Sequence, residues 1–166
     1  MLSGSGDPSG SAGNATRVTA LVPIIAMVVS ATVSLAPPAR ADLASDLRDA
    51  VAQARGGSSC GALHADPVAD RVAATVNKSY SDWLDHTSTY PPITDPLPGL
   101  KELGYHGTKG KLLGGASKKN RADAIKGVVL EGYAAIADCS FTDYGVNMWR
   151  NEASGYSLAA VVLAGR

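Results

Sequence analysis

Among the residues whose side chains commonly act in catalysis or bind metals, histidine and cysteine are the rarest in this 166-residue chain. It has three histidines and two cysteines. His64, His86 and His106 lie in separate stretches of the sequence, so they offer little material for a metal site that needs two histidines. The glycine-rich stretch at residues 107–115 lacks the Gly-Lys-Ser/Thr of a phosphate-binding loop. From these residues we predict no metal site, no cofactor and no assigned catalytic residue.

The two cysteines, Cys60 and Cys139, are predicted to form a disulfide that serves the fold. The chain has no Cys-x-x-Cys motif, and neither cysteine has a histidine within three residues to activate its thiol. Two lone cysteines usually pair in an oxidising compartment. A bridge between them would close a loop of about 80 residues, which is worth roughly 4–5 kcal/mol. The alternative is that one of them is a reactive thiol.

The N-terminal sequence predicts export to such a compartment. Residues 18–36 are almost entirely apolar, and the small-x-small pattern that signal peptidase recognises ends at Ala41. We therefore expect a signal peptide, 1–41, cleaved before Asp42, and a single domain, 42–166, that is extracellular or held in the cell envelope. The alternative, a retained membrane anchor, is disfavoured by a proline and several hydroxyl residues within the apolar run.

The balance of charge argues against a nucleic-acid partner. Lysine and arginine together number 15, as do aspartate and glutamate, whereas nucleic-acid binders carry a basic surplus. Basic residues nevertheless gather between residues 106 and 126, namely Lys109, Lys111, Lys118, Lys119, Arg121 and Lys126. This cluster is either a solvated face or a patch for an anionic envelope lipid or glycan.

Hydrophobic periodicity and capping residues predict three helices and three strands after the leader. The clearest signal is Asp66 followed by Pro67, the N-cap and first-turn pair of a helix that ends near His86. The other predicted elements are a helix capped by Asp42 and stopped by Gly56, a strand at 111–115, a helix at 117–138, and strands at 143–150 and 155–164. A glycine in the turn between the last two strands favours a hairpin.

Each longer helix has an apolar stripe that we expect to face the core. The stripes are Val68, Val72, Val76, Tyr80 and Trp83 in the second helix, and Ala122, Ile125, Val129, Tyr133 and Ile136 in the third. Helices followed by a short run of strands predict an α+β domain built in layers.

The order of these elements and several short motifs resemble the CAP superfamily, the cysteine-rich secretory, antigen 5 and pathogenesis-related 1 proteins. The segments that carry the resemblance are "ALHADPV", "WLDH", "LKELGYHG", "CSFTDYGVNM" and "GYSLAAVVLAG". They span nearly all of residues 42–166. The resemblance implies an α-β-α layered domain with three main helices and a small antiparallel sheet that ends in a C-terminal hairpin.

The sequence departs from that family where its cleft places two histidines and two acidic residues that can hold a divalent metal. Only His86 falls where one of these groups is expected, since "KGKLLGGAS" lacks the glutamate and "VVLEGYAAIADC" lacks the second histidine. His86 is therefore the sole candidate for a catalytic role and one candidate for ligand binding, and the alternative is a helix-end residue whose charge suits the helix dipole. Tyr105, Tyr144 and Trp149 are candidates for lining a cleft, although aromatic residues in strands more often belong to the core.

Two classes of function fit these observations. The first is a secreted, non-enzymatic module that binds a lipid or another small apolar ligand, or presents a surface to an envelope glycan or an unknown protein partner. The second is a secreted hydrolase that uses a residual cleft around His86, or a scavenger of haem or metal that relies on the three histidines and the tyrosines. The shortage of acids and histidines favours the first class.

Overall fold

The structure is a computed structural model that describes residues 39–166, with side chains described from residue 44. The predicted signal peptide therefore lies outside the described residues, apart from its last three positions. The elements in chain order are α1 (Ala39–Gly56), β1 (His64–Ala65), α2 (Pro67–Leu84), α3 (Leu97–Glu102), β2 (Lys109–Ser117), α4 (Arg121–Ile136), β3 (Phe141–Arg150) and β4 (Ser157–Gly165). No helix among the described residues is both long and apolar enough to cross a bilayer.

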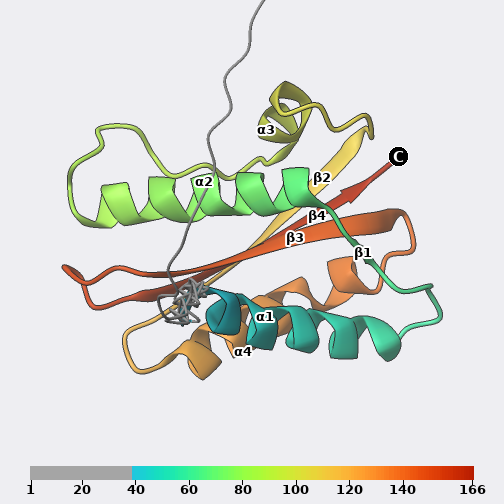
Figure 1. The fold of residues 1–166 in the computed structure, drawn as a ribbon, viewed down its shortest axis with the longest axis horizontal. Coiled ribbons are helices and arrows are strands. Elements are labelled where there is room, and N and C mark those ends of the chain that lie inside the picture. Colours follow the sequence, from blue (N-terminus) through green and yellow to red (C-terminus); the bar gives the residue numbers. More distant parts are fainter. Residues whose placement is uncertain (1–38) are drawn as a thin grey trace, which may run out of the picture. The chain divides into compact units, whose positions relative to one another are not determined.

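One four-stranded sheet, in the order β1-β3-β4-β2, lies between two layers of helices (Figure 1). Helices α2 and α3 cover one face, and α1 and α4 cover the other. β2, β4 and β3 are antiparallel, while the two-residue β1 pairs with β3 in parallel. The predicted α+β class and CAP-like layering are confirmed, and the additions are the short helix α3 and the parallel strand β1.

The central strand β4 explains why both layers are needed. All nine of its residues are buried, because alternate side chains point into opposite helical layers. Val161 and Leu163 belong to the core beneath α1 and α4, whereas Ala160 and Val162 belong to the core beneath α2. A continuous apolar run such as "SLAAVVLAG" is typical of a strand covered on both faces.

Helix α2 begins as predicted, since the Asp66 carboxylate accepts hydrogen bonds from the amides of Val68 and Ala69 at 2.8 and 2.9 Å. The helix also covers the part of the outer edge of β3 that the two-residue β1 leaves without a partner strand. Asp70 accepts a hydrogen bond from the Val146 amide at 2.8 Å, which satisfies a backbone donor that a neighbouring strand would otherwise pair.

This close approach of α2 to β3 requires glycine in the strand. A Cβ atom at Gly145 would overlap the backbone of Ala69 and Asp70. Further along the same edge, the Asn77 amide donates to the carbonyl of Asn147 at 2.9 Å. The edge of β3 is therefore closed by side chains of α2 rather than by another long strand.

The predicted disulfide is confirmed, and it joins the turn after α1 to the turn after α4. Cys60 and Cys139 are bonded across a sequence separation of 79 residues. Beside them, the guanidinium of Arg55 donates to the carbonyls of Gly61, Ile136, Asp138 and Phe141 at 2.7–2.9 Å. Arg55, in the last turn of α1, is only 4 % exposed. Its guanidinium lies at the C-terminal end of α4, where a cation is favoured by the helix dipole.

The structure corrects two of the predicted helical stripes. Tyr80 and Trp83 of α2 are about two-fifths exposed rather than inward. In α4 the sheet-facing row is Ala124, Val128, Gly132 and Ile136, so of the predicted stripe only Ile136 is buried. The physical reason is that the sheet packs against the row with the smaller side chains, which lets the helix come close.

The boundaries of several elements also differ from the prediction. Helix α1 begins at Ala39, so Asp42 lies inside its first turn and is not its cap. Strand β2 is longer than the predicted 111–115, and α4 is shorter than 117–138. The C-terminal hairpin is confirmed, and its turn has Gly155 at a φ of 75°, in the region that glycine adopts most easily.

Candidate ligand-binding groove

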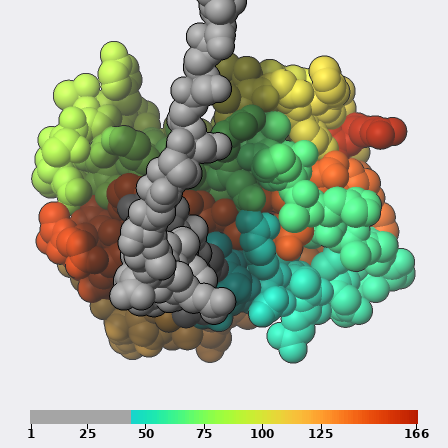
Figure 2. All heavy atoms as spheres, in the orientation of Figure 1, coloured from blue at the N-terminus to red at the C-terminus, as the bar shows by residue number. Residues whose placement is uncertain are grey.

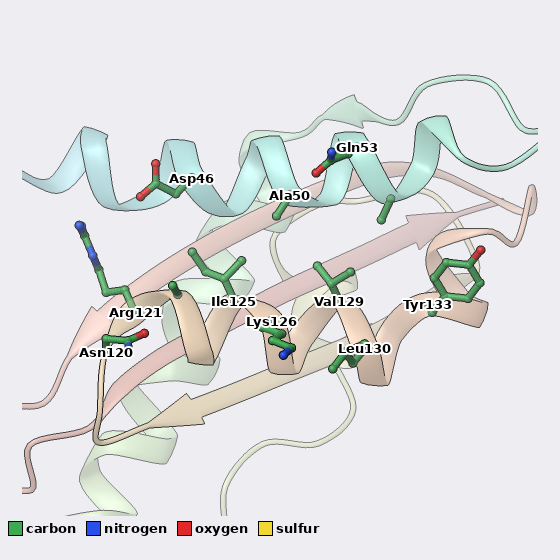
Figure 3. A pocket seen from close by; sticks show the side chains of 12 residues that line it. Asp46, Ala50, Gln53, Asn120, Arg121, Ile125, Lys126, Val129, Leu130 and Tyr133 are labelled. Carbon is green, nitrogen blue, oxygen red and sulfur yellow. The ribbon is translucent and has the colours of Figure 1, made fainter.

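An open groove of about 760 Å³ runs between α1 and α4 on the outside of the helical layer. We call it the α1–α4 groove, and Figure 3 shows Ile125 and Val129 of α4 pointing across it toward Ala50 of α1. The described residues that line it are Asp46, Ala50, Gln53, Ala54, Asn120, Arg121, Ala122, Ile125, Lys126, Val129, Leu130 and Tyr133. Its volume falls within the range of small-molecule sites, about 300–1,000 Å³.

The groove exists because the two helices present side chains of unequal size. Alanines of α1 face branched aliphatic residues of α4, and the short alanine side chains leave the space between the helices unfilled. Leu130 and Tyr133 extend the apolar lining outward and are 68 % and 60 % exposed. Large apolar side chains that stay exposed and contiguous commonly mark a binding surface.

The ends and rim of the groove are polar. Asp46 of α1 and Arg121 of α4 stand at one end, and the hydroxyl of Tyr133 stands at the other (Figure 3). Lys126 is exposed on the α4 side of the same groove. A chain-like apolar ligand would therefore find a cationic group beside an otherwise uncharged middle section.

The residues predicted as ligand contacts do not come together in the structure. His86 is exposed just after α2, with a positive φ of 56°, so it acts as the left-handed residue that ends the helix. Tyr144 is buried in the core beneath α1 and α4, and Trp149 is exposed near the end of β3. Tyr105 lies at the other end of α2 from His86, beside β1.

The three histidines are also separated, since His64 precedes α2 and His86 follows it. A helix of this length spans about 27 Å, at about 1.5 Å for each residue. His106 is exposed in the segment after α3. Across residues 44–166 the structure contains no group of three or more His, Cys, Asp or Glu that could hold a metal ion.

Around His86, the polar groups that lie nearest in sequence serve the fold. The Asn151 amide, from the hairpin turn, donates to Ser81 Oγ at 2.8 Å and to the Asp85 carboxylate at 2.9 Å. Figure 2 shows this turn, in orange-red, beneath the yellow-green loop that follows α2. Ser81 and Asp85 therefore hold the hairpin against the end of α2.

A polar cluster lies at the opposite end of α2, centred on Asp143. Its carboxylate accepts hydrogen bonds from the Tyr105 hydroxyl at 2.7 Å and from the Thr142 hydroxyl at 2.8 Å, and His64 Nδ1 lies 3.9 Å away. Burial, followed by the hydrogen bond to Asp143, raises the pKa of Tyr105 above its usual value near 10. Tyr105 therefore stays protonated and acts as a donor that links the α3 segment to β3.

One stretch matches the Gly-x-Ser-x-Gly spacing of a hydrolase nucleophile elbow, at residues 57–61. The stretch lies between α1 and β1, and its Cys60 forms the disulfide with Cys139. The elbow of a hydrolase instead joins a strand to the helix that follows it. The stretch therefore lacks the context that this chemistry needs.

Sequence reasoning missed the α1–α4 groove because it assigned the lining residues of α4 to the core. Ala122, Ile125, Val129 and Tyr133 form one row of the helix, and the buried row lies beside it. The signal that could have revealed the groove is the width of the apolar surface. Helix α4 has two adjacent rows of apolar or small residues, which is more than contact with one sheet requires.

No family model matches the sequence, and no curated protein is similar enough in sequence to match. The fold, however, resembles solved structures. An outer surface protein from Borrelia burgdorferi superposes with a TM-score of 0.57 at 12 % identity, over 74 % of this chain and 91 % of that one.

Two further similar structures are those of a cysteine-rich secretory protein and of a protein that contains an SCP domain. A cysteine-rich secretory protein from Staphylococcus aureus gives a TM-score of 0.56 at 10 % identity, over 76 % of this chain and 39 % of that one. An extracellular protein containing an SCP domain from Bacillus anthracis gives 0.58 at 14 % identity, over 76 % and 41 %. This chain therefore spans about two-fifths of each of these two proteins. With the layered architecture described above, these likenesses show that the chain has the α-β-α fold of the CAP, or SCP, domain.

Proposed function

We propose that this protein is a secreted or cell-envelope binding module that takes a single-chain amphiphile in the α1–α4 groove. The observation that carries the proposal is the apolar lining of α4, in which Ile125 and Val129 are half-buried and Leu130 and Tyr133 are exposed, set against the small side chains of α1. An extended hydrocarbon chain fits this shape because it gains contact along the whole row.

The charges at the rim favour an anionic head group. Lys126 has an exposed ammonium on the α4 side, whereas Arg121 stands at the same end as Asp46, which offsets its charge. Lys126 is therefore the group that we expect to meet a carboxylate or phosphate of the ligand. An exposed contact of this kind contributes modestly, so most of the affinity comes from the apolar row.

The lining also supports binding rather than hydrolysis. Among the described residues around the groove there is no histidine, cysteine, serine or threonine, and Asp46 is the only acid. A hydrolytic site needs a nucleophile or an activated water together with a base within hydrogen-bond reach. The binding role is therefore the better candidate.

The test compares dodecanoate with dodecanol, two probes that share a hydrocarbon chain and differ in charge, by titration calorimetry. Ala50→Phe fills the middle of the groove and should weaken both probes at least about tenfold. Lys126→Glu should weaken dodecanoate and leave dodecanol nearly unchanged. Arg71→Glu, an exposed cation on α2 in the opposite layer, is the matched control. Wild-type affinity in Ala50→Phe, with its circular dichroism unchanged, would contradict the proposal.

The proposal of secretion has its own test, which is the N-terminal sequence of the protein recovered from culture fluid or envelope. We expect the mature chain to begin at Asp42, which would remove the first three residues of α1. Recovery of residues 18–36 in the membrane fraction would instead support the anchor.

A further inference from the structure

Strand β2 forms a free edge of the sheet. It pairs with β4 through all nine of its residues, and none of the strands within residues 39–166 lies on its other side. Among the hydrogen bonds of the described residues, the backbone groups of 110–116 bond to β4 alone. Every second amide and carbonyl of this strand is consequently unpaired, which makes it a template for another extended segment.

The two faces of β2 differ. Leu113 and Gly115 face α4, since Leu113 packs in the core beneath that helix and a Cβ at Gly115 would overlap Ala124 and approach Val128. Leu112 faces α2, where it packs against the other core. By alternation, Lys109, Lys111 and Ser117 share the α4 face, and Gly114 shares the α2 face.

The strand is also asymmetric along its length. Its first half contains Lys109 and Lys111, and its second half, residues 114–117, is made only of small residues. We propose that β2 pairs antiparallel with β2 of a second copy of this chain, in a register centred on Leu113. In this register Lys111 lies opposite Gly115 of the other copy and Leu112 lies opposite its Gly114, so each of these two large side chains meets a small one. Leu113 alone lies opposite its own counterpart, and in each copy it is buried beneath α4.

On the α2 face the register places Leu112 of one copy in a hole of the other. A Cβ at Gly114 would meet no atom within 4 Å, so the space above it is open. This space belongs to a groove of about 610 Å³ whose lining includes Val76, Tyr80 and Ile93. Tyr80 and Ile93 are 40 % and 38 % exposed, and the inserted leucine would cover them.

On the α4 face the same register brings opposite charges together. Glu131 and Gly127 of α4 line the groove beside Gly115. Lys111 of the second copy, lying opposite Gly115 on this face, therefore approaches Glu131, and two-fold symmetry repeats the pair. A pairing centred on Lys111 would instead set like charges directly opposite, which destabilises a strand pair. Charge complementarity thus favours a second copy of this chain as the partner of β2, in the register centred on Leu113.

The dimer edge and the α1–α4 groove are on different sides of α4, since the groove is lined by Ile125 and Val129 and the edge by Gly127 and Glu131. The inference therefore does not depend on the proposed ligand. Dimer formation would leave the groove open on both copies and place the two grooves on the same face of one continuous sheet.

The test is sedimentation equilibrium of the wild-type protein, of three interface variants and of one control variant. Lys111→Glu and Glu131→Lys should each raise the dimer dissociation constant about tenfold or more, because both symmetric pairs become repulsive. The double variant Lys111→Glu/Glu131→Lys restores opposite charges and should return to within about threefold of wild type. The exposed Lys78→Glu of α2 is the control and should have no effect.

A fourth variant tests the shape of the interface. Gly114→Val fits the strand but fills the hole that receives Leu112, and it should abolish dimers. In the wild-type dimer, the outward amides of residues 110–116 should exchange with deuterium more slowly as protein concentration rises. A monomer at about 100 μM would overturn the inference, since specific homodimers form well below this concentration. A dimer whose dissociation constant is unchanged by both Lys111→Glu and Gly114→Val would overturn the inference as well.

Discussion

Replacing Arg55 by methionine should destabilise the protein more than loss of any exposed arginine, because Arg55 holds together three segments through backbone carbonyls. Its guanidinium donates to carbonyls before β1, at the end of α4 and at the start of β3. Methionine keeps much of the length and volume of the side chain and removes every donor. The substitution therefore isolates the polar role of the residue.

The expected loss follows from which carbonyls become unsatisfied. The bonds to Ile136 and Phe141 are buried, whereas Gly61 and Asp138 are exposed and water can replace the lost donor there. Leaving a buried acceptor without a partner costs about 1–3 kcal/mol, so two of them cost about 2–6 kcal/mol. Removing the buried cation recovers part of this through the relief of desolvation. We expect a net loss of about 3 kcal/mol.

The measurement is urea unfolding followed by circular dichroism, with the disulfide kept oxidised in every sample. For a domain of this size, with a slope of about 1.5 kcal/mol per M, the midpoint should fall by about 2 M. Arg71→Met is the matched control on an exposed helical position and should stay within about 0.5 kcal/mol of wild type. Arg55→Lys, with three donors on one nitrogen, should fall between the two. A loss below about 1 kcal/mol for Arg55→Met would refute the reasoning, because the carbonyls would then be satisfied without the arginine.

Three other predictions follow from local features. The double variant Cys60→Ala/Cys139→Ala should lose roughly 2–5 kcal/mol in the same assay, while the native protein should resist thiol labelling until it is unfolded and reduced. His86→Gly should preserve or slightly raise the free energy of unfolding, and His86→Val should lower it by about 1–2 kcal/mol, because a left-handed φ suits glycine and strains a β-branched residue. The pKa of Tyr105 is higher in the folded than in the unfolded protein, where it is near 10, so the stability that it contributes is complete below pH 10 and is lost as pH rises above this value. The difference in free energy of unfolding between wild type and Tyr105→Phe should therefore shrink between pH 9 and pH 11. A constant difference across that range would mean that Tyr105 does not titrate differently in the folded state.

Local chemistry in the sequence determined the features that depend on neighbouring residues. The pair Asp66 and Pro67 begins a helix wherever it occurs before an apolar stripe, and the structure has α2 beginning there. The alternation and the turn glycine near the C-terminus likewise predicted the hairpin, and two lone cysteines predicted their own bridge. The layered α+β class followed from the order of these elements.

Only the tertiary structure decided which side of α4 is buried. Helix α4 has two neighbouring apolar rows, and periodicity cannot choose between them because both repeat at the helical spacing. The sheet selects the row of Ala124 and Gly132, since small side chains allow the helix to approach β2, and the row of Ile125 and Val129 is left to line the groove. In the same way, Arg55 in the sequence is an ordinary cation in the last turn of a helix. Three of its four partners are carbonyls more than 80 residues away, and only folding brings them within reach.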